Sequence, residues 1–191
     1  VFASTSATTA SGLFPLAGGS PVWYRTATYG SSSLGGITTN ITATGDSTPT
    51  NSYGTGSSAF MWIGDQQRTE TLSVSFDKPV YQVKIEFDAL NNDGTNKDTL
   101  SFQVNGVNLV LSSANLSPSG TSVSGNTIIG SGGGVYSFTS STPINSLSVT
   151  DTISGGPSGV GVAVQYNSAP LQASGGVAIS ALMPAATDAD G

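Results

Sequence analysis

Residues able to perform acid–base or nucleophilic chemistry are scarce in this sequence. It contains no histidine and no cysteine, which removes Ser-His-Asp and Cys-His catalysis, histidine general bases and the usual zinc ligands. A pair of carboxylates can still hydrolyse a glycoside, but Glu70 and Glu86 are the only glutamates. Glu86 lies two residues from Lys84 on the polar side of an alternating segment, where a solvated cross-strand charge pattern is the simpler interpretation. We therefore expect a protein that is not an enzyme.

The densest group of metal-ligating atoms lies in the segment DALNNDGTNKD, residues 88–98. Calcium takes roughly six to eight oxygen ligands from carboxylates, amides and the backbone. The segment lacks the spacing and the final glutamate of an EF-hand, and an ordinary Asn-Asp-Gly turn is the alternative interpretation. A further carboxylate, Asp151, could approach from a later strand. The ligands expected for a calcium ion here are Asp88, Asn92, Asp93 and Asp98.

Aromatic and amide side chains near the expected loops form a second candidate site. Sugar rings stack on aromatic faces, and sugar hydroxyls bond to planar amide, carboxylate and guanidinium groups. The alternative for the tryptophans and tyrosines is packing in the core. The residues expected to bind a ligand are Trp23, Tyr24, Arg25, Tyr53, Asp65 and Gln66.

A central stretch of alternating apolar and polar residues, 71–111, must position these groups. Alternation with a period of two residues places one side of a strand on a core and the other in water. The stretch predicts four consecutive strands, the first ending at Pro79, because proline has no N–H for a ladder. Asn105-Gly106 predicts a type I′ hairpin turn, whose central residues need positive φ. The side chains expected in the core include Leu72, Val74, Phe76, Tyr81, Val83, Ile85, Phe87, Leu100, Phe102, Val104, Val107, Leu109 and Leu111.

Shorter strands are expected on both sides of this central stretch. Residues 34–44 read as a polar strand carrying Ile37 and Ile41, and the continuous apolar run 59–63 is typical of a strand buried on both faces. Gly30 and the serines after it read as a loop, and residues 45–58 as a long loop. Later strands are expected at 127–129, 135–138, 144–151 and 160–166.

Composition predicts a single all-β domain. The chain has 191 residues, 25 of them glycine, and only 8% are charged, while serine, threonine and asparagine are abundant. These residue types favour strands and turns over helix interiors. We expect a partly ordered entry segment with one short strand at 1–20, one β-sandwich domain at 21–182 and a linker at 183–191.

The charge of the chain argues against nucleic acid as a partner. The net charge is −6, and the five lysines and arginines are scattered along the sequence rather than clustered. No apolar run approaches the ~20 residues of a membrane-spanning helix, so membrane insertion is not expected. Low charge with many serines, threonines, asparagines and glycines is typical of an extracellular surface protein.

Three segments carry a resemblance to a known class of domain. The runs SFDKPVYQVKIEFDAL, TLSFQVNG and LSVTDTISGGPSGVGVAVQY fall within residues 70–166. In rhythm they resemble the jelly-roll modules of large secreted bacterial proteins, including adhesins and carbohydrate-binding modules. The resemblance implies a two-sheet antiparallel β-sandwich whose ligands bind at loops on one end or on a concave sheet face.

Two functions are consistent with these observations. The first is a non-catalytic extracellular binding module of a bacterial surface protein, recognising a glycan or another surface ligand through loops at one end of the sandwich. The alternative is a structural subunit or spacer of a fibre, surface layer or adhesin stalk. Either would operate beside neighbouring domains of a larger chain.

Overall fold

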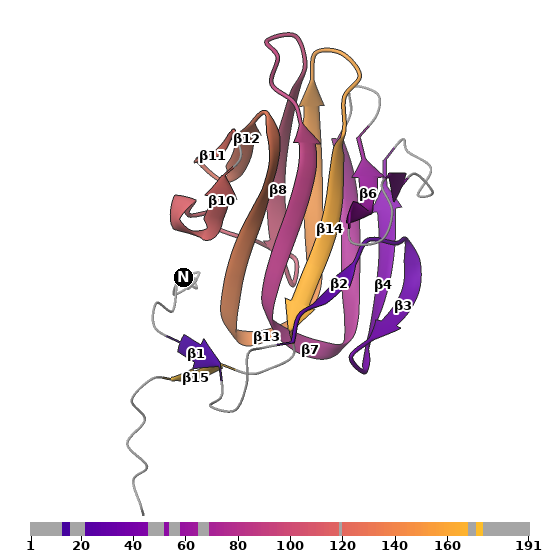
Figure 1. The fold of residues 1–191 in the computed structure, drawn as a ribbon, viewed down its shortest axis with the longest axis vertical. Coiled ribbons are helices and arrows are strands. Elements are labelled where there is room, and N and C mark those ends of the chain that lie inside the picture. Colours follow the sequence, from indigo (N-terminus) through magenta and orange to yellow (C-terminus); the bar gives the residue numbers. More distant parts are fainter. Residues whose placement is uncertain are drawn as a thin grey trace, which may run out of the picture.

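The regular structure of this protein consists of β-strands and one short 3-10 turn at Ser113–Asn115, in the part of the chain that the structure describes. The structure is a computed structural model that describes residues 13–15, 22–45, 52–53, 58–64, 69–118, 120–167 and 171–173. The strands (Figure 1) are β1 (Leu13–Pro15), β2 (Tyr24–Thr26), β3 (Gly30–Leu34), β4 (Ile37–Thr44), β5 (Ser52–Tyr53), β6 (Phe60–Ile63), β7 (Thr69–Leu90), β8 (Lys97–Val104), β9 (Val107–Asn108), β10 (Leu116–Pro118), β11 (Thr121–Ser124), β12 (Thr127–Gly130), β13 (Gly132–Ser154), β14 (Val160–Asn167) and β15 (Leu171–Ala173).

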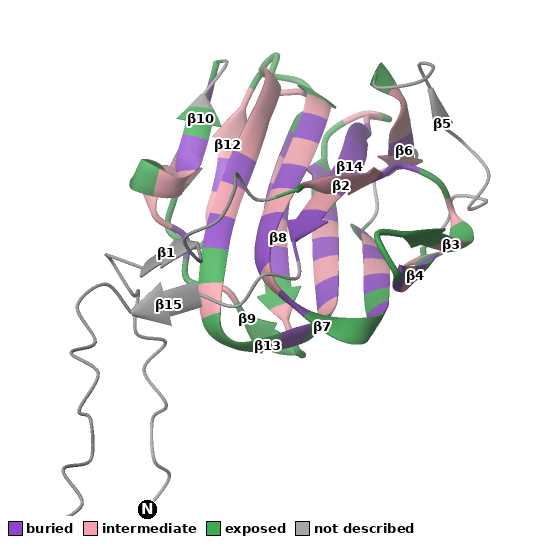
Figure 2. Ribbon diagram, turned by 60° about the horizontal axis from the view of Figure 1, so that its bottom comes forward, coloured by how far each residue is buried: buried purple, intermediate pink, exposed green. Residues whose placement is uncertain are grey.

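Two long antiparallel strands, β7 and β13, run through the whole domain. They contain 22 and 23 residues and pair with each other over both of their halves. Residues 71–76 of β7 also pair with β4, whereas residues 82–88 pair with β14. The pairing shifts register between the two halves, and there both strands turn together, as the exposed bends beside the labels β7 and β13 show in Figure 2. Each long strand therefore has two different sets of neighbours.

Pro79 bends β7 and does not end it, so the expectation of a strand end there was wrong. Asp77, Lys78 and Pro79 are exposed, and no residue of β13 pairs with the segment between Ser75 and Val80. The missing N–H of proline costs no ladder bond at an unpaired bend. Polar contacts to the β3–β4 turn hold the bend in place: Asp77 Oδ1 accepts a 2.6 Å hydrogen bond from the Thr38 amide, and Lys78 Nζ donates a 2.5 Å bond to the Gly36 carbonyl.

Hydrogen bonds join the main strands into one open antiparallel sheet. The order is β11-β12-β8-β13-β7-β14-β6-β5, with β2, β3, β4, β9 and β10 attached beside this path, and β1 pairs separately with β15. The prediction of an antiparallel all-β fold is thereby confirmed. The finer division into two jelly-roll sheets stays a prediction, because β7 and β13 connect their own halves into a continuous sheet.

The apolar sides of both halves of the long strands belong to one hydrophobic core. Leu72 and Val74 in the first half of β7 are buried, as are Val83 and Ile85 in the second half. Figure 2 shows the resulting alternation of buried and partly exposed residues along β7, β8 and β13. The largest fully buried side chains include Tyr136, Tyr166, Phe87 and Phe102. The inward parity read from the sequence is confirmed for these strands, except at the start of the second half of β7, where Gln82 is buried and Tyr81 is partly exposed.

The hairpin predicted at Asn105-Gly106 is present, but its second strand is short. Asn105 has φ 50° and Gly106 has φ 78°, as a type I′ turn requires. The returning strand β9 covers only two residues, and Val107 is 70% exposed, so the expectation that it enters the core was wrong. Leu109 packs against the core from the loop that follows, and Leu111 is buried there.

Three further local expectations were only partly correct. β6 alternates, with Met61 and Ile63 buried and Phe60 and Trp62 partly exposed, so it is not buried on both faces. The serines after Gly30 form strand β3 because they pair with β4, whose Ile37 and Ile41 are buried as expected. The short strand expected in the entry segment is β1. Residues 183–191 lie outside the described residues.

The core assignment of β8 predicts unequal effects for two neighbouring substitutions. Phe102 is 2% exposed and its ring lies 5.5 Å from that of Tyr136, whereas Ser101 points outward. Phe102→Ala should lower the free energy of unfolding by ~3–5 kcal/mol. Ser101→Ala should change it by less than about 0.5 kcal/mol. Urea denaturation of both variants measures this, and equal losses would mean that the register of β8 is wrong.

Candidate functional site

The residues expected to bind a ligand do not form one site in the described structure. β2 pairs with β14, which places Tyr24 beside Tyr166 and Arg25 beside Gln165 on the opposite face. The Tyr24 ring packs 5.9 Å from the ring of Tyr166 on the core side, so Tyr24 is a packing residue. The side chain of Tyr53, and Asp65 and Gln66 altogether, lie outside the described residues.

Arg25 is engaged within the protein. Its Nε donates a 2.8 Å hydrogen bond to Glu86 Oε2, and a terminal nitrogen donates a 2.7 Å bond to the Ala59 carbonyl. The guanidinium also lies 5.2 Å from the centre of the Phe60 ring, and Gln165 donates its amide N–H to the other Glu86 oxygen. Glu86 therefore pairs with arginine on β2 and is not part of a solvated pair with Lys84.

Trp23 is likewise matched to a neighbour on the same outer face. The Nζ of Lys84 lies 4.1 Å from the centre of its ring, a cation–π contact. Trp23 and Arg25 thus join β2 to the second half of β7 through interactions that are internally satisfied. Both residues could be found from the sequence, but their partners could not, because β2 reaches β7 only through its pairing with β14. That arrangement brings Arg25 to Glu86, 61 residues away.

The residues expected to bind calcium, within 88–98, do not come together at one site either. The Oδ1 of exposed Asp93 accepts 2.8 Å hydrogen bonds from the Thr95 and Asn96 amides, which lower the pKa of that carboxyl. Asp98 instead points into the protein and is 1% exposed. Asp88 is the β-ladder partner of Gly161, and the Asn92 amide donates to Ser131 Oγ. In the described ranges, no three acidic, histidine or cysteine side chains are grouped closely enough to hold a metal ion.

An uncharged polar surface covers the outer side of residues 40–44 of β4, 71–75 of β7, 146–150 of β13 and 101–103 of β8. The exposed Lys97, at the start of β8, lies outside this surface. We call this surface the hydroxyl face. Its side chains stand in rows across the strands: Thr42 is opposite Ser73, Ser73 opposite Ser148, and Ser148 opposite Gln103. No member is charged. The hydroxyl face consists of Asn40, Thr42, Thr44, Thr71, Ser73, Ser75, Ser101, Gln103, Ser146, Ser148 and Thr150.

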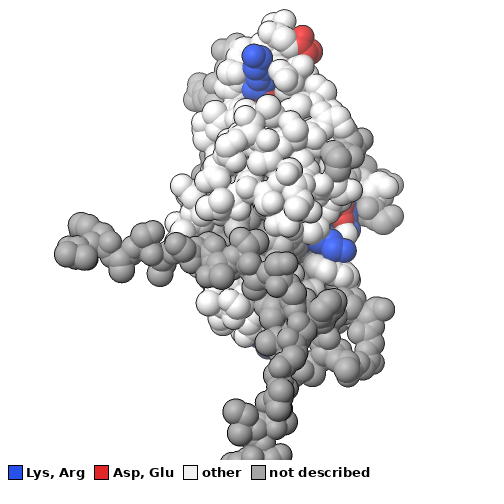
Figure 3. All heavy atoms as spheres, turned by 90° about the vertical axis from the view of Figure 1, so that its left-hand side faces the viewer, with Lys and Arg blue, Asp and Glu red and all other residues white. Residues whose placement is uncertain are grey.

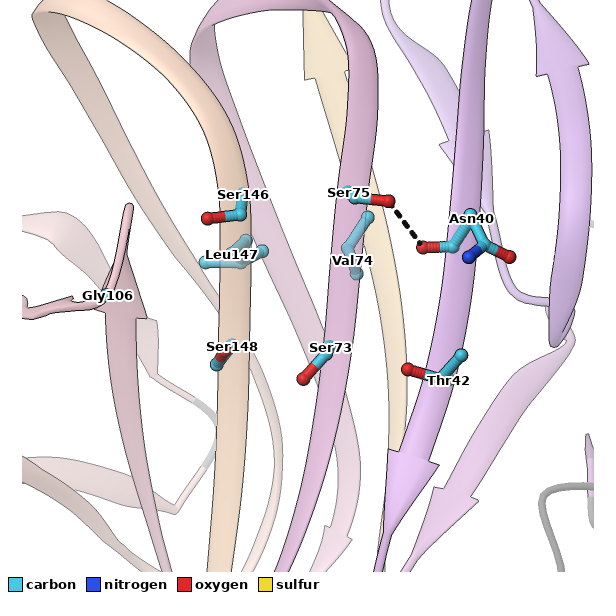
Figure 4. Close-up of a pocket in the computed structure, with 9 residues that line it drawn as sticks. All are labelled: Asn40, Thr42, Ser73, Val74, Ser75, Gly106, Ser146, Leu147 and Ser148. Atoms are coloured by element: carbon cyan, nitrogen blue, oxygen red, sulfur yellow. Dashed lines mark hydrogen bonds between the residues drawn. The ribbon is translucent and has the colours of Figure 1, made fainter.

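A shallow groove of about 310 Å³ crosses the hydroxyl face. Figure 4 shows the hydroxyls of Ser73 and Ser148 on neighbouring strands, with β4 on one side and the Gly106 turn on the other. Ser75 Oγ donates a long 3.4 Å bond to the Asn40 carbonyl. Among hydrogen bonds between described residues, none uses the side-chain hydroxyls of Ser73 or Ser148. These groups are accessible to a ligand.

From the sequence, the residues of this groove were expected only to face water. They come from segments more than 100 residues apart, and only the register of β4, β7 and β13 assembles them. One local signal was present: the outward positions of the first half of β7 are threonines and serines, whereas those of the second half include Lys84 and Glu86. On the side of the molecule seen in Figure 3, charged atoms occupy only a few separate spots.

Comparison with known proteins gives no relative for this chain: no family model, no curated protein and no solved structure matches it. Within the described part of the chain, no helix has the length and apolar character needed to span a bilayer. The function must therefore be inferred from the chemistry of the described surfaces.

The Arg25–Glu86 contact predicts a measurable coupling energy. Both side chains are largely buried, with 19% and 15% of their surfaces exposed, so screening by solvent is incomplete. Arg25→Ala should lower the free energy of unfolding by about 1–2 kcal/mol, between the values for surface and buried pairs. Lys97→Ala, at an exposed lysine, is the control and should change it by less than about 0.5 kcal/mol. A double-mutant cycle with Glu86→Gln that gave additive losses would contradict the pairing.

Proposed function

We propose that this chain is a non-catalytic extracellular binding module that recognises a neutral glycan on its hydroxyl face. The observation that carries this proposal is the uncharged groove lined by Ser73, Ser146 and Ser148. This groove supports the expectation of a glycan-binding module. The proposed binding surface is the face of the sheet and not the loops at one end.

The chemistry of the groove matches a neutral polyhydroxy ligand. Serine and threonine hydroxyls both donate and accept hydrogen bonds, and the amide of Asn40 offers both functions in one plane. Covering such groups costs less than covering charges, provided that the ligand replaces the lost water bonds. A phosphate-bearing or strongly anionic ligand would find no cation among the residues of the hydroxyl face.

The same residues argue against catalysis in the groove. A serine hydroxyl becomes an effective nucleophile only with an adjacent general base or another activating group. Neither Ser73 nor Ser148 has a histidine or carboxylate among the groove residues, so their hydroxyls remain ordinary hydrogen-bonding groups. Binding without turnover is the expected outcome.

Binding by a single copy of this groove should be weak. A net hydrogen bond contributes only about 0.5–1.5 kcal/mol, and no aromatic ring lines the groove to add stacking. Three or four such bonds correspond to a dissociation constant on the order of millimolar. Useful affinity then comes from avidity, which suits a module repeated or displayed many times on a bacterial surface protein.

The proposal includes a jelly-roll sandwich as the architecture of this module. Its support is the shared bend of β7 and β13, which directs the apolar sides of both halves to one core. In a sandwich the strands turn corners by bending or bulging from one layer to the next. The low charge and the abundance of serine and threonine support a secreted setting.

A structural subunit of a fibre or surface layer is the second candidate. It is favoured by Val107 and Val110, which are 70% and 68% exposed beside the hairpin that borders the groove. Interface cores are depleted of charged residues, as the hydroxyl face is. Light scattering over a range of protein concentrations decides this case: a mass that rises with concentration supports self-assembly, and a constant monomer mass contradicts it.

Glycan binding is tested by an array of neutral polysaccharides followed by titration calorimetry. Ser148→Asp places a charge in the centre of the groove and should weaken binding on the order of tenfold or more, because the new carboxylate must be desolvated. Thr139→Asp adds the same charge to the far half of β13, at an exposed position, and should change affinity less than twofold.

Two results would contradict this placement of the ligand. Equal losses in both variants would mean that net charge matters and position does not. Loss of glycan binding in Trp23→Ala would place the ligand at Trp23 and Lys84, beside β2. Absence of any bound glycan in the array and by calorimetry would refute the function itself.

A further inference from the structure

Three carboxylates are buried at one end of the core, under the turns that connect β7 to β8 and β13 to β14. Glu70, Asp98 and Asp151 are 2%, 1% and 0% exposed. Glu70 and Asp151 are direct partners across the β7–β13 ladder. Asp98 lies on the next strand, β8, where its partner is Ile153, two residues from Asp151. All three share the inward parity of Leu72, Leu100 and Val149.

Gly64 and Ser158 show how these carboxylates approach one another. One oxygen of Glu70 accepts a hydrogen bond from the Gly64 amide. Asp151 Oδ2 lies so near that a Cβ added to Gly64 would be 2.6 Å from it. Asp98 Oδ2 accepts 2.7 Å and 3.0 Å bonds from Ser158 Oγ and the Asn91 amide. The side chains of Glu70 and Asp151 therefore meet at Gly64, with Asp98 beside them.

The two aspartates of this cluster have few partners. Neither carboxylate oxygen of Asp151, nor Oδ1 of Asp98, makes a hydrogen bond of normal geometry, although the Thr99 amide lies near Asp151. No described lysine or arginine pairs with either aspartate. Burying a carboxylate without a donor or a cation costs several kcal/mol, so proteins pair or neutralise such groups.

The electrostatics of the cluster agree with this geometry. Burial, and then the negative charges of Asp98 and Glu70, raise the pKa of Asp151 to about 8, although the Thr99 amide opposes the shift. Burial also raises the pKa of Asp98, and the hydroxyl of Ser158 opposes it. Both shifts indicate that negative charge on the two aspartates is poorly compensated.

We propose that Glu70, Asp98 and Asp151 bind a calcium ion. A single added proton neutralises only one of three carboxylates, and a water molecule donates hydrogen bonds without changing the charge. A divalent cation attracts all the unpartnered oxygens together. Calcium suits the site because it accepts carboxylate oxygens in irregular geometry, whereas magnesium demands near-octahedral geometry and keeps its own waters. In the structure the three carboxylates are not close enough together to hold an ion, so calcium binding requires their side chains to move toward one another.

This inner site differs from the calcium site that the sequence suggested at residues 88–98. Only Asp98 belongs to both. Asp93 is held by two backbone amides of its own turn, outside the protein. Asp151, which the sequence suggested only as a distant contributor, becomes the central ligand because it lies between β7 and β8. The inference does not depend on the proposed glycan function.

Calcium in this position would fix the end of the domain where two turns meet. Asp98 is already bonded to Ser158, and Asn96 Oδ1 accepts a 2.5 Å bond from the Gly156 amide. These contacts tie the β7–β8 turn to the β13–β14 turn, which lie next to each other at the top of Figure 1. An ion that binds only the folded protein stabilises it by mass action.

Calorimetry and thermal melts on the whole chain, at neutral pH, test the proposal. Calcium should bind with one ion per chain, and the melting temperature should rise by several degrees with calcium and fall with a chelator. Magnesium at the same concentration should have a smaller effect. Asp151→Asn should abolish the calcium response, because it removes one of the three carboxylate ligands. Asp93→Asn is the matched control and should retain the full response.

Three results would overturn the proposal. One is a melting temperature that is the same with calcium and with chelator, together with no calcium heat in the wild type. Another is loss of the response in Asp93→Asn, which would place the ion on the exposed turn. The third is retention of the response in Asp98→Asn, the variant to use if Asp151→Asn does not fold.

Discussion

The fold depends on one interaction, the antiparallel ladder between β7 and β13. The two strands stay paired from Thr152 opposite Thr69 to Gly132 opposite Leu90, apart from the register shifts at the bend. The other strands of the large sheet attach to this ladder directly or through intervening strands. Because the pairing continues on both sides of the bend, the two halves must place their apolar sides against the same core. The bend determines which side of each half faces the core and which faces solvent, and no single side chain has as large an effect.

The outward and inward sides of this ladder carry different chemistry along its length. The first half of β7 presents serine and threonine hydroxyls outward, and the second half presents Lys84 and Glu86 to Trp23 and Arg25. In the first half of β7 and the second half of β13, inward positions are apolar until the end of the ladder, where Asp151 and Glu70 face each other. The proposed glycan groove and the proposed calcium site are thus opposite sides of the same strands. Calcium binding would stabilise the ladder whose register forms the groove.

Much of this fold could be predicted from the alternation of apolar and polar residues alone. The predictions that were wrong have physical causes. Leu72, Val74, Phe102 and the Asn105-Gly106 turn follow from local rules that the structure obeys. The prediction of a strand end at Pro79 was wrong because a local rule cannot distinguish a strand end from an unpaired bend. The inward position of Asp98 follows from its spacing of two from Leu100, but Asp98 was interpreted as part of a single calcium-binding turn at 88–98. The hydroxyl face and the partner of Arg25 required strand order, which the local pattern does not encode.

Native-state hydrogen exchange of the β7 and β13 amides tests the central claim most directly. If one ladder supports both halves, amides of buried residues in the first half, such as Leu72 and Val149, should exchange only through global unfolding. Amides in the second half, such as Ile85 and Tyr136, should show the same free energy of exchange within about 1 kcal/mol, because both halves open together. Exchange of one half through a local opening, with much lower protection than the other, would contradict the account and divide the domain at the bend.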